Sequence, residues 1–317
     1  MSTQIRKPFD LVVAVPFAAT LVLILVGSVF YPQMLGLDYL SQQLQIAAFL
    51  GVIAMGATIV ILLGHIDLSV PWVLGGAALI STTLAGTGDP TLTMLAIPAA
   101  LGFGALIGCL NAVGVVILRI PSMVWTLAMN SILLGSSVLY TGGFNPKGEA
   151  SGLMSFVATG RVLGVPMAFV LWMGVALVLA LVLHRTGFGR YLSAIGYNEK
   201  ATYLSGVSTP SVLFAAFAIA GVCSALGGVL LAGYANQAYQ SMGDPYLLPT
   251  IAAVVIGGTS ILGGSGGLVG TIGGVFFITL LNSVLSVMQI SEAWRNITFG
   301  LIILVMLLIQ TLRRKEG

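Results

Sequence analysis

The residues most suited to chemistry in this sequence are a histidine and an aspartate two positions apart, His65 and Asp67, beside a long apolar stretch. An ionisable side chain at membrane depth is costly and is usually functional, so this pair could relay a proton. Asp67 also stands just before the apolar segment that starts at Leu68, where an aspartate can cap a helix by accepting its free amide protons. The sequence leaves both interpretations open, and we designate Asp67 as a gate or a cap.

The sequence indicates neither nucleotide hydrolysis nor thiol chemistry. A phosphate-binding loop needs Gly-Lys followed by Ser or Thr, whereas the four lysines of this chain precede Pro, Gly, Ala and Glu. The two cysteines, Cys109 and Cys223, lie in apolar stretches without metal-ligand spacing or a nearby histidine. We therefore expect no enzymatic activity, no metal site and no cofactor in this chain. If ATP drives the protein, another chain must hydrolyse it.

The composition indicates a protein embedded in a membrane. Apolar residues make up 58% of the 317 residues and charged residues only 7%, against roughly 25% charged residues in soluble domains. A chain of this length in water would cover its outside with polar groups, so the outside must face lipid instead. The net charge of +3 is small and scattered, which argues against nucleic-acid binding because that needs a clustered basic face.

About ten stretches have the roughly 20 mostly apolar residues that a helix needs to cross a membrane. They cover residues 11–31, 42–63, 68–86, 92–118, 122–141, 166–184, 210–234, 246–262, 267–288 and 295–312. The eighth is short and bounded by glycine. The first follows Arg6 and Lys7, but it is longer than a signal-peptide core and no small-residue cleavage site follows it, so we expect an uncleaved span. We predict a single all-α transmembrane domain over residues 1–317.

The basic residues predict how these spans are oriented. With the N-terminus inside, the nine basic residues on the cytoplasmic side are Arg6, Lys7, Arg119, Arg185, Arg190, Lys200, Arg313, Arg314 and Lys315. Only Lys147, Arg161 and Arg295 then lie outside. This distribution agrees with the bias of Lys and Arg toward cytoplasmic loops. We therefore predict that both termini are cytoplasmic.

Glycine-rich helix faces predict close packing between helix backbones, since lipid offers no hydrophobic drive for association. The clearest faces contain Gly102, Gly104 and Gly108 in one span, and Gly270, Gly273 and Gly274 in another. We interpret both faces as packing surfaces and not as binding sites.

Two polar loops could meet partners. The cytoplasmic loop 185–209 contains Asn198, which can cap a short helix, with Glu199 in the first turn and Gly206 just past the end. This loop is a docking element or an ordinary connection. The outward loop 142–165 is the largest external segment, and it could meet an extracytoplasmic partner or serve as a solvated connector.

Two joints flanked by glycine, 64–76 and 257–274, interrupt the apolar pattern between consecutive spans. Each follows a span that runs inward and precedes one that runs outward. Many transporters contain internal repeats, so the joints could be corresponding parts of such a repeat, although their sequences match weakly.

The chain resembles the monosaccharide permease family of bacterial ATP-binding-cassette (ABC) importers, of which the ribose permease is the best-known member. Four stretches in order carry the resemblance over nearly the whole chain. They are GHIDLSV at 64–70, LNAVGVVILRIPSMVWTLAM at 110–129, GRYLSAIGYNEKATYLSGV at 189–207 and AAVVIGGTSILGGSGGLVGTIGG at 252–274. The family usually reads GGIDLSVG in the first stretch. Here His65 and Pro71 replace two glycines, which makes this turn stiffer.

The resemblance implies a ten-helix fold like that of vitamin B12 permeases (type II importers) in the bacterial inner membrane. It also implies a complex with a second permease subunit, identical in a homodimer, with cytoplasmic ATPase subunits that use ATP and Mg, and with an extracytoplasmic sugar-binding protein. By similarity, the residues on the segment that couples to the ATPase are Gly189, Arg190, Ala194, Gly196, Asn198, Ala201, Ser205 and Gly206. Glu199 joins them through its place in the predicted helix.

Asparagines within the spans are candidates for the translocation path. Asn111 and Asn282 match positions where the family has asparagine, and we add Asn130, which also lies within a predicted span. Their amides could exchange hydrogen bonds with sugar hydroxyls along the axis of a dimer. The alternative is hydrogen bonding between helices, worth only about 1 kcal/mol each.

The sequence therefore predicts the permease subunit of an ABC importer that moves a neutral sugar, a ribose-like pentose or another monosaccharide, by alternating access. A neutral substrate is expected because the spans contain few charges. Three alternatives stay open: an ABC permease for branched-chain amino acids, an ion-coupled carrier acting through His65 and Asp67, and a membrane scaffold without transport.

Overall fold

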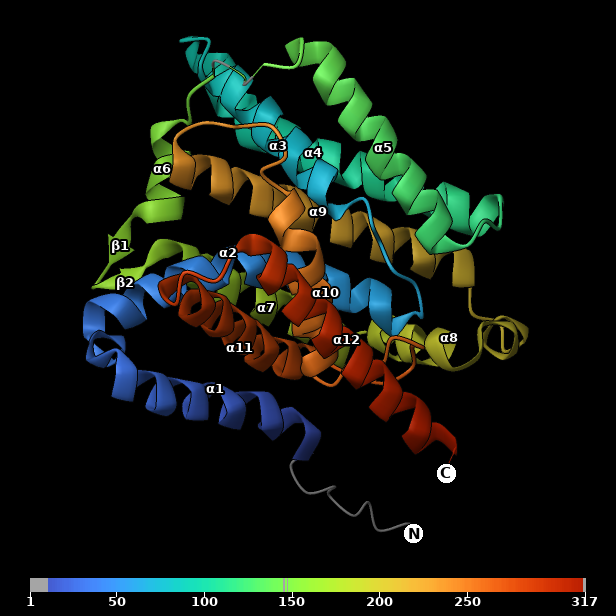
Figure 1. The fold of residues 1–317 in the computed structure, drawn as a ribbon. Coiled ribbons are helices and arrows are strands. Elements are labelled where there is room, and N and C mark those ends of the chain that lie inside the picture. The colour runs from blue at the N-terminus through green and yellow to red at the C-terminus, as the bar shows by residue number, and fades with distance from the viewer. Residues whose placement is uncertain (1–10, 145, 147, 316–317) are drawn as a thin grey trace.

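Nearly all of the regular secondary structure is helical, because an apolar chain in lipid must satisfy its backbone hydrogen bonds internally. The computed structural model describes residues 11–144, 146 and 148–315 (Figure 1). Arg6, Lys7 and Lys147 lie outside the described residues. The helices and strands are α1 (Leu11–Phe30), η1 (Pro32–Leu35), α2 (Leu37–Leu62), α3 (Val70–Ala85), α4 (Pro90–Ala112), η2 (Val113–Ile117), α5 (Ser122–Thr141), α6 (Gly152–Thr159), β1 (Arg161–Val162), β2 (Val165–Pro166), α7 (Met167–Arg185), α8 (Gly187–Leu204), α9 (Thr209–Ala235), η3 (Asp244–Tyr246), α10 (Leu247–Ile256), α11 (Leu268–Val287) and α12 (Glu292–Lys315).

The predicted class, an all-α protein that crosses the membrane several times, is confirmed. Each of the predicted apolar stretches coincides with a helix, and in the described part of the chain seven helices are long and apolar enough to span. Those seven are α1, α2, α4 with η2, α5, α7, α9 and α11. Helices α3 and α10 are shorter, with 16 and 10 residues. The predicted stretch 246–262 is too long, since α10 ends at Ile256 and Gly258 turns the chain with φ of 87°.

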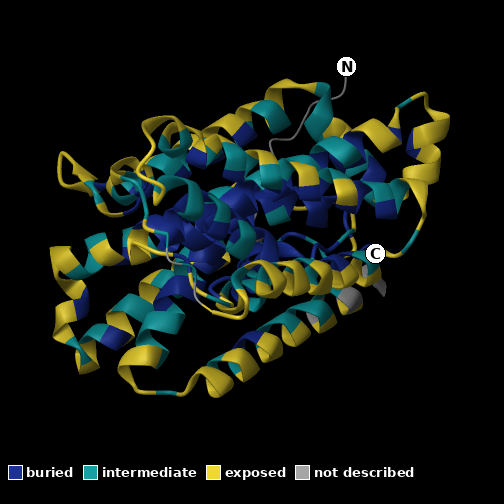
Figure 2. Ribbon diagram, turned by 90° about the horizontal axis from the view of Figure 1, so that it is seen from above, coloured by how far each residue is buried: buried dark blue, intermediate teal, exposed yellow. Residues whose placement is uncertain are grey.

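The centre of the bundle is formed by α2 and α9. In the most apolar part of each helix, 78% of α2 and 67% of α9 is buried, compared with 11% of α1. Figure 2 shows the buried residues gathered in the middle and the exposed ones on the peripheral helices. This arrangement suits a membrane protein, because the outer helices present apolar side chains such as Leu21 and Leu139 to lipid.

Glycines allow the helix backbones to touch at several crossings, as predicted. A Cβ added at Gly104 or Gly108 of α4 would overlap carbonyl oxygens of α9. Gly270 and Gly274 of α11 lie in the same way against the backbone of α10, and Gly273 faces the ring of Phe17 in α1. Gly102 is different, since a Cβ there would meet nothing within 4 Å. The small-residue faces therefore serve packing.

The two polar loops lie at opposite ends of the bundle. Helix α8 lies at the same end of the bundle as the beginning of α1 and the end of α12 (Figure 1). Helix α6 and the hairpin β1–β2, which pairs Arg161 with Pro166, lie at the other end. A backbone bridge between Glu149 and Gln237 fastens the outward loop to the segment before α10. The basic residues predict that the α8 end is the cytoplasmic one.

Candidate functional site

Helix α8 consists of two helices joined at a sharp kink. Asn198 has non-helical backbone angles, φ of −161° and ψ of 99°, and its Oδ1 accepts the backbone N–H of Ala201 at 3.0 Å. The hydroxyl of Thr202 donates to the carbonyl of Asn198 at 2.8 Å. Glu199 lies in the first turn of the second helix, and Gly206 follows its end with φ of 85°. The predicted short helix capped by Asn198 is thus confirmed.

The two faces of α8 differ sharply in exposure. Its buried residues are Leu192, Ile195 and Thr202. Its exposed charged residues are Arg190, Glu199 and Lys200. Beside these charges, Tyr197, Tyr203 and Leu204 are 73%, 62% and 84% exposed. Exposed aromatic and aliphatic side chains among charges, at a polar end of the molecule, are typical of a surface that docks another protein.

The remaining residues of the predicted coupling set divide between these faces. Gly189 lies against the carbonyl of Leu183 and closes the corner between α7 and α8. Ala194 and Gly196 are half-buried on the inner side. Ala201 and Ser205 are exposed with Gly206, and the hydroxyl of Ser205 donates to the carbonyl of Ala201 at 2.9 Å. The inner residues attach α8 to the bundle, and the outer ones are available to a partner.

A buried polar cluster fixes the start of α3. Asp67 is 8% exposed, and its Oδ1 accepts the backbone N–H and the hydroxyl of Ser69 at 2.9 and 2.6 Å. The amide Nδ2 of Asn111 in α4 donates to both carboxylate oxygens, at 3.3 and 3.4 Å, and to the Ser69 hydroxyl at 2.8 Å. Helix α3 begins at Val70, two residues after the predicted start. The N-cap position of α3 is Ser69, so Asp67 does not cap the helix as predicted but forms a turn ahead of it. Its role as a gate stays a prediction.

Helix α5 holds the same joint from the other side. The backbone N–H of Ile66 donates to Oγ of Ser122 at 3.3 Å, and that of Leu68 donates to Oγ1 of Thr126 at 2.9 Å. Sequence reasoning missed both hydroxyls, although they stand one helical turn apart in a stretch that carries the family resemblance. The joint between α2 and α3 is thus attached to α4 and α5 by side-chain hydrogen bonds.

His65 does not share a hydrogen bond with Asp67 among the described contacts. The imidazole of His65 lies near the ring of Phe217, with 6.1 Å between the ring centroids. The side-chain partners of Asp67 are Ser69 and Asn111. The geometry therefore gives no support to a proton relay through the pair.

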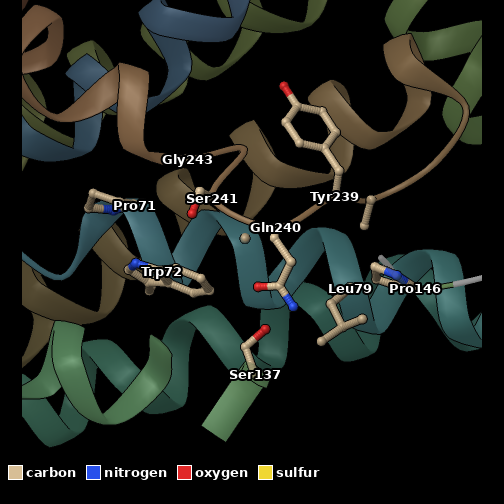
Figure 3. A pocket seen from close by; sticks show the side chains of 11 residues that line it. Pro71, Trp72, Leu79, Ser137, Pro146, Tyr239, Gln240, Ser241 and Gly243 are labelled. Atoms are coloured by element: carbon tan, nitrogen blue, oxygen red, sulfur yellow. The ribbon is translucent and has the colours of Figure 1, made fainter. Parts of the chain in front are cut away.

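Two hollows lie between α3 and α5. The smaller, of about 10 Å³, is bounded by α3, α5 and the segment before α10, and Trp72, Ser137 and Gln240 point toward one another across it (Figure 3). It has space for about one water molecule. The larger, a cleft of about 680 Å³, lies where α3 and α5 end. Its lining residues are Thr83, Gly86, Thr87, Tyr140, Thr141, Phe144, Pro146 and Gly148, none of which is charged.

Comparison with known proteins decides the family. Residues 39–307 match the family described as the permease component of branched-chain amino acid transport systems. The chain belongs to this permease family. It is 34% identical over 295 residues to the ribose import permease protein of Haemophilus influenzae, covering 92% of this chain and 91% of that protein. It is 35% identical over 308 residues to the ribose import permease protein of Bacillus subtilis, covering 95% and 93%.

A further relative is the autoinducer 2 import system permease protein of Escherichia coli O157:H7, which is 33% identical over 291 residues, covering 91% of this permease and 84% of the relative. These relatives confirm the predicted resemblance to sugar permeases. No solved structure matches this permease. The likeness to vitamin B12 permeases therefore stays an expectation.

The three asparagines predicted for the translocation path do not come together within one chain of the permease. Asn111 is fully buried in the Asp67 cluster, which fits the alternative role of bonding between helices. Oδ1 of Asn282 accepts Nη1–H of Arg295 at 3.1 Å and so links α11 to α12. Oδ1 of Asn130 in α5 is buried without a hydrogen-bond partner among the described residues. Oδ1 of Asn111 lacks a partner as well, but its Nδ2 is bound to Asp67 and Ser69, which leaves Asn130 as the candidate for the path.

Proposed function

We propose that this permease is the membrane-spanning subunit of an ABC importer that carries a neutral sugar, a ribose-like pentose or another monosaccharide, across the bacterial inner membrane by alternating access. The observation that carries the proposal is its identity of 34 to 35% to two ribose import permeases over more than nine tenths of the chain. The family description names branched-chain amino acids. The named relatives favour the sugar branch instead.

The outer cleft supports a neutral and polar substrate. Its lining combines hydroxyl groups of Thr83, Thr87 and Thr141 with the rings of Tyr140 and Phe144. Hydroxyl groups can exchange hydrogen bonds with a sugar, and an aromatic ring offers an apolar face with a polar edge. The volume of about 680 Å³ falls in the range of small-molecule sites, about 300 to 1,000 Å³. A charged substrate would find no counter-charge among these lining residues.

The exposed face of α8 supports an energy source outside this chain. We infer that cytoplasmic ATPase subunits dock there, hydrolyse ATP with Mg, and move α8, so that this chain is not itself an enzyme. We infer further that the sugar-binding protein docks at the opposite end, beside α6 and the hairpin, and that a second copy of the chain completes the path. The carboxylate of Asp67 already accepts hydrogen bonds from Ser69 and Asn111. This argues against the alternative of an ion-coupled carrier.

Vesicle uptake tests the proposal. The permease is reconstituted with its ATPase, and radiolabelled ribose is supplied with the sugar-binding protein. We expect uptake to require ATP and the ATPase, because the chain carries no phosphate-binding loop. Uptake should fall to the level of empty vesicles when the ATPase is omitted, and collapse of the ion gradients with ionophores should leave it unchanged. Uptake that follows the ion gradient in the absence of the ATPase would instead establish a secondary carrier.

The translocation path can be tested at Asn130. If its unpartnered Oδ1 faces the path, Asn130→Ala removes a hydrogen bond to the passing sugar. We expect the ribose concentration at half-maximal uptake to rise about fivefold, as the loss of roughly 1 kcal/mol predicts. Ser131→Ala is the control, because that exposed hydroxyl bonds within its own helix, to Leu127. Equal concentration dependence in both variants would remove Asn130 from the path.

A further inference from the structure

Helix α8 meets the two joints of the bundle at a contact made almost entirely of backbone. We call the group Gly64, Gly196, Gly263 and Gly264 the glycine junction. Gly196 belongs to α8, Gly64 to the joint after α2, and Gly263 and Gly264 to the joint after α10. These parts of the chain lie together at the α8 end of the bundle (Figure 1). The coupling segment therefore touches both joints at once.

The contacts in the glycine junction leave no room for a side chain. A Cβ added at Gly196 would overlap both the carbonyl oxygen of Leu62 and the amide nitrogen of Gly264. A Cβ at Gly263 would lie 2.7 Å from the amide nitrogen of Gly64. The N–H of Gly264 donates to the Leu62 carbonyl at 2.9 Å and fastens the joints together. Backbone atoms cannot rotate away as side chains can, so any displacement of Gly196 also displaces Leu62 and Gly264.

The first joint leads from the glycine junction into α3. Leu62 is the last residue of α2, and the chain continues through the Asp67 cluster into α3. The hydrogen bonds to Ser122 and Thr126 attach this joint to α5 as well. A shift at Leu62 would therefore reach α3 and α5, the two helices that border both hollows.

The second joint leads from the glycine junction into α11. Its backbone is closed on itself, since the N–H of Ser260 donates to the Ser265 carbonyl at 2.9 Å. The side chain of Gln310 in α12 accepts the N–H of Ile261 and donates to the Thr259 carbonyl, both at 3.3 Å. This joint follows α10 and precedes α11. The glycine junction thus links α8 through a continuous network to α3 and α5 by the first joint, and to α10, α11 and α12 by the second.

We propose that the glycine junction transmits the movement of α8 to both joints, and that Gly196 is the residue that positions the two joints against α8. The proposal rests on the proposed function, in which an ATPase moves α8. Because the contact is between backbones, a displacement of α8 moves the ends of α2 and α10 together. A single displacement of α8 therefore shifts both joints at the same time.

Replacement of Gly196 by alanine tests the proposal. The added methyl group would separate α8 from both joints, while the docking face of α8 is unchanged. We expect Gly196→Ala to copurify with the ATPase and to hydrolyse ATP in proteoliposomes, yet to move about tenfold less ribose per ATP, as a coupling loss of this kind predicts. Gly267→Ala is the control in the second joint, since its φ of 177° is extended and a Cβ there meets nothing within 4 Å.

A milder variant covers the case in which Gly196→Ala does not purify. Gly64 belongs to the glycine junction but not to the exposed face of α8, and an added Cβ there would have the Leu262 carbonyl oxygen as its nearest neighbour, at 3.2 Å. We expect Gly64→Ala to fold and to lower the ribose moved per ATP, with its ATP hydrolysis retained. A wild-type ratio in Gly196→Ala, or in Gly64→Ala where the first does not purify, would overturn the proposal. If the unmodified complex shows no ATP-dependent uptake, the proposed function itself is overturned, and this inference with it.

Discussion

Gly221→Leu is expected to prevent the permease from reaching a stable fold. Gly221 in α9 and Gly104 in α4 face each other so closely that a Cβ on either would overlap the carbonyl oxygen of the other. Both obstacles are backbone atoms, so the side chain cannot be accommodated by a rotamer change. The helices would have to separate along a crossing in the centre of the bundle. The cost should exceed about 3 kcal/mol, the upper part of the usual range for overpacking.

The measurement is the yield of monodisperse protein after detergent extraction and size-exclusion chromatography. Gly102→Leu is the control on α4, because Gly102 is exposed and a Cβ there meets nothing within 4 Å. We expect the control to elute like the unmodified permease and Gly221→Leu to aggregate. A monodisperse Gly221→Leu would show that α4 and α9 do not cross at this point.

Asp67→Ala is expected to destabilise the permease strongly as well. The substitution leaves the Ser69 backbone N–H and hydroxyl, and the amide of Asn111, without the carboxylate that they share. Loss of the partner of a buried polar group costs about 1 to 3 kcal/mol. We expect the apparent melting temperature, followed by tryptophan fluorescence, to fall by about 5 °C, which corresponds to roughly 2 kcal/mol in a chain of this size.

Asp67→Asn separates the structural role from a chemical one. Its Oδ1 can still accept both Ser69 donors, and the unpartnered Oδ1 of Asn111 can accept from the new amide if the Asn111 side chain turns over. We therefore expect near-normal stability and near-normal ribose uptake. Normal stability with abolished uptake would show that the carboxylate itself takes part in transport, and the proton relay would then have to be reconsidered.

Much of the fold was predictable because it follows from local properties of the chain. The low charge and the apolar stretches predict membrane helices directly, since a lipid-facing helix needs only length and apolarity. The short helix in α8 was predictable because its cap lies within a few residues of the groups it serves, as Asn198 does with Ala201. The end of α10 was predicted too late because Ile261 and Leu262 continue the apolar pattern after the glycine turn.

The parts of the candidate site that sequence reasoning missed depend on contacts between distant residues. Ser122 and Thr126 look like ordinary hydroxyls of a span, and only the fold brings them to the backbone of Ile66 and Leu68. Likewise, the chain separates Gly264 from Leu62 by most of the protein, although their backbones are hydrogen-bonded. Periodicity and capping do not contain this information, because it arises from how the helices pack.

We propose that an ATPase on the cytoplasmic side supplies the energy for transport through α8. The most direct measurement is photo-crosslinking from a benzophenone side chain placed at Tyr203 of α8, which is 62% exposed, or at Leu163 of the opposite hairpin, which is 99% exposed. We expect a crosslink to the ATPase from Tyr203 and none from Leu163. A crosslink from Leu163 alone, or ATPase binding that leaves position 203 free, would contradict it.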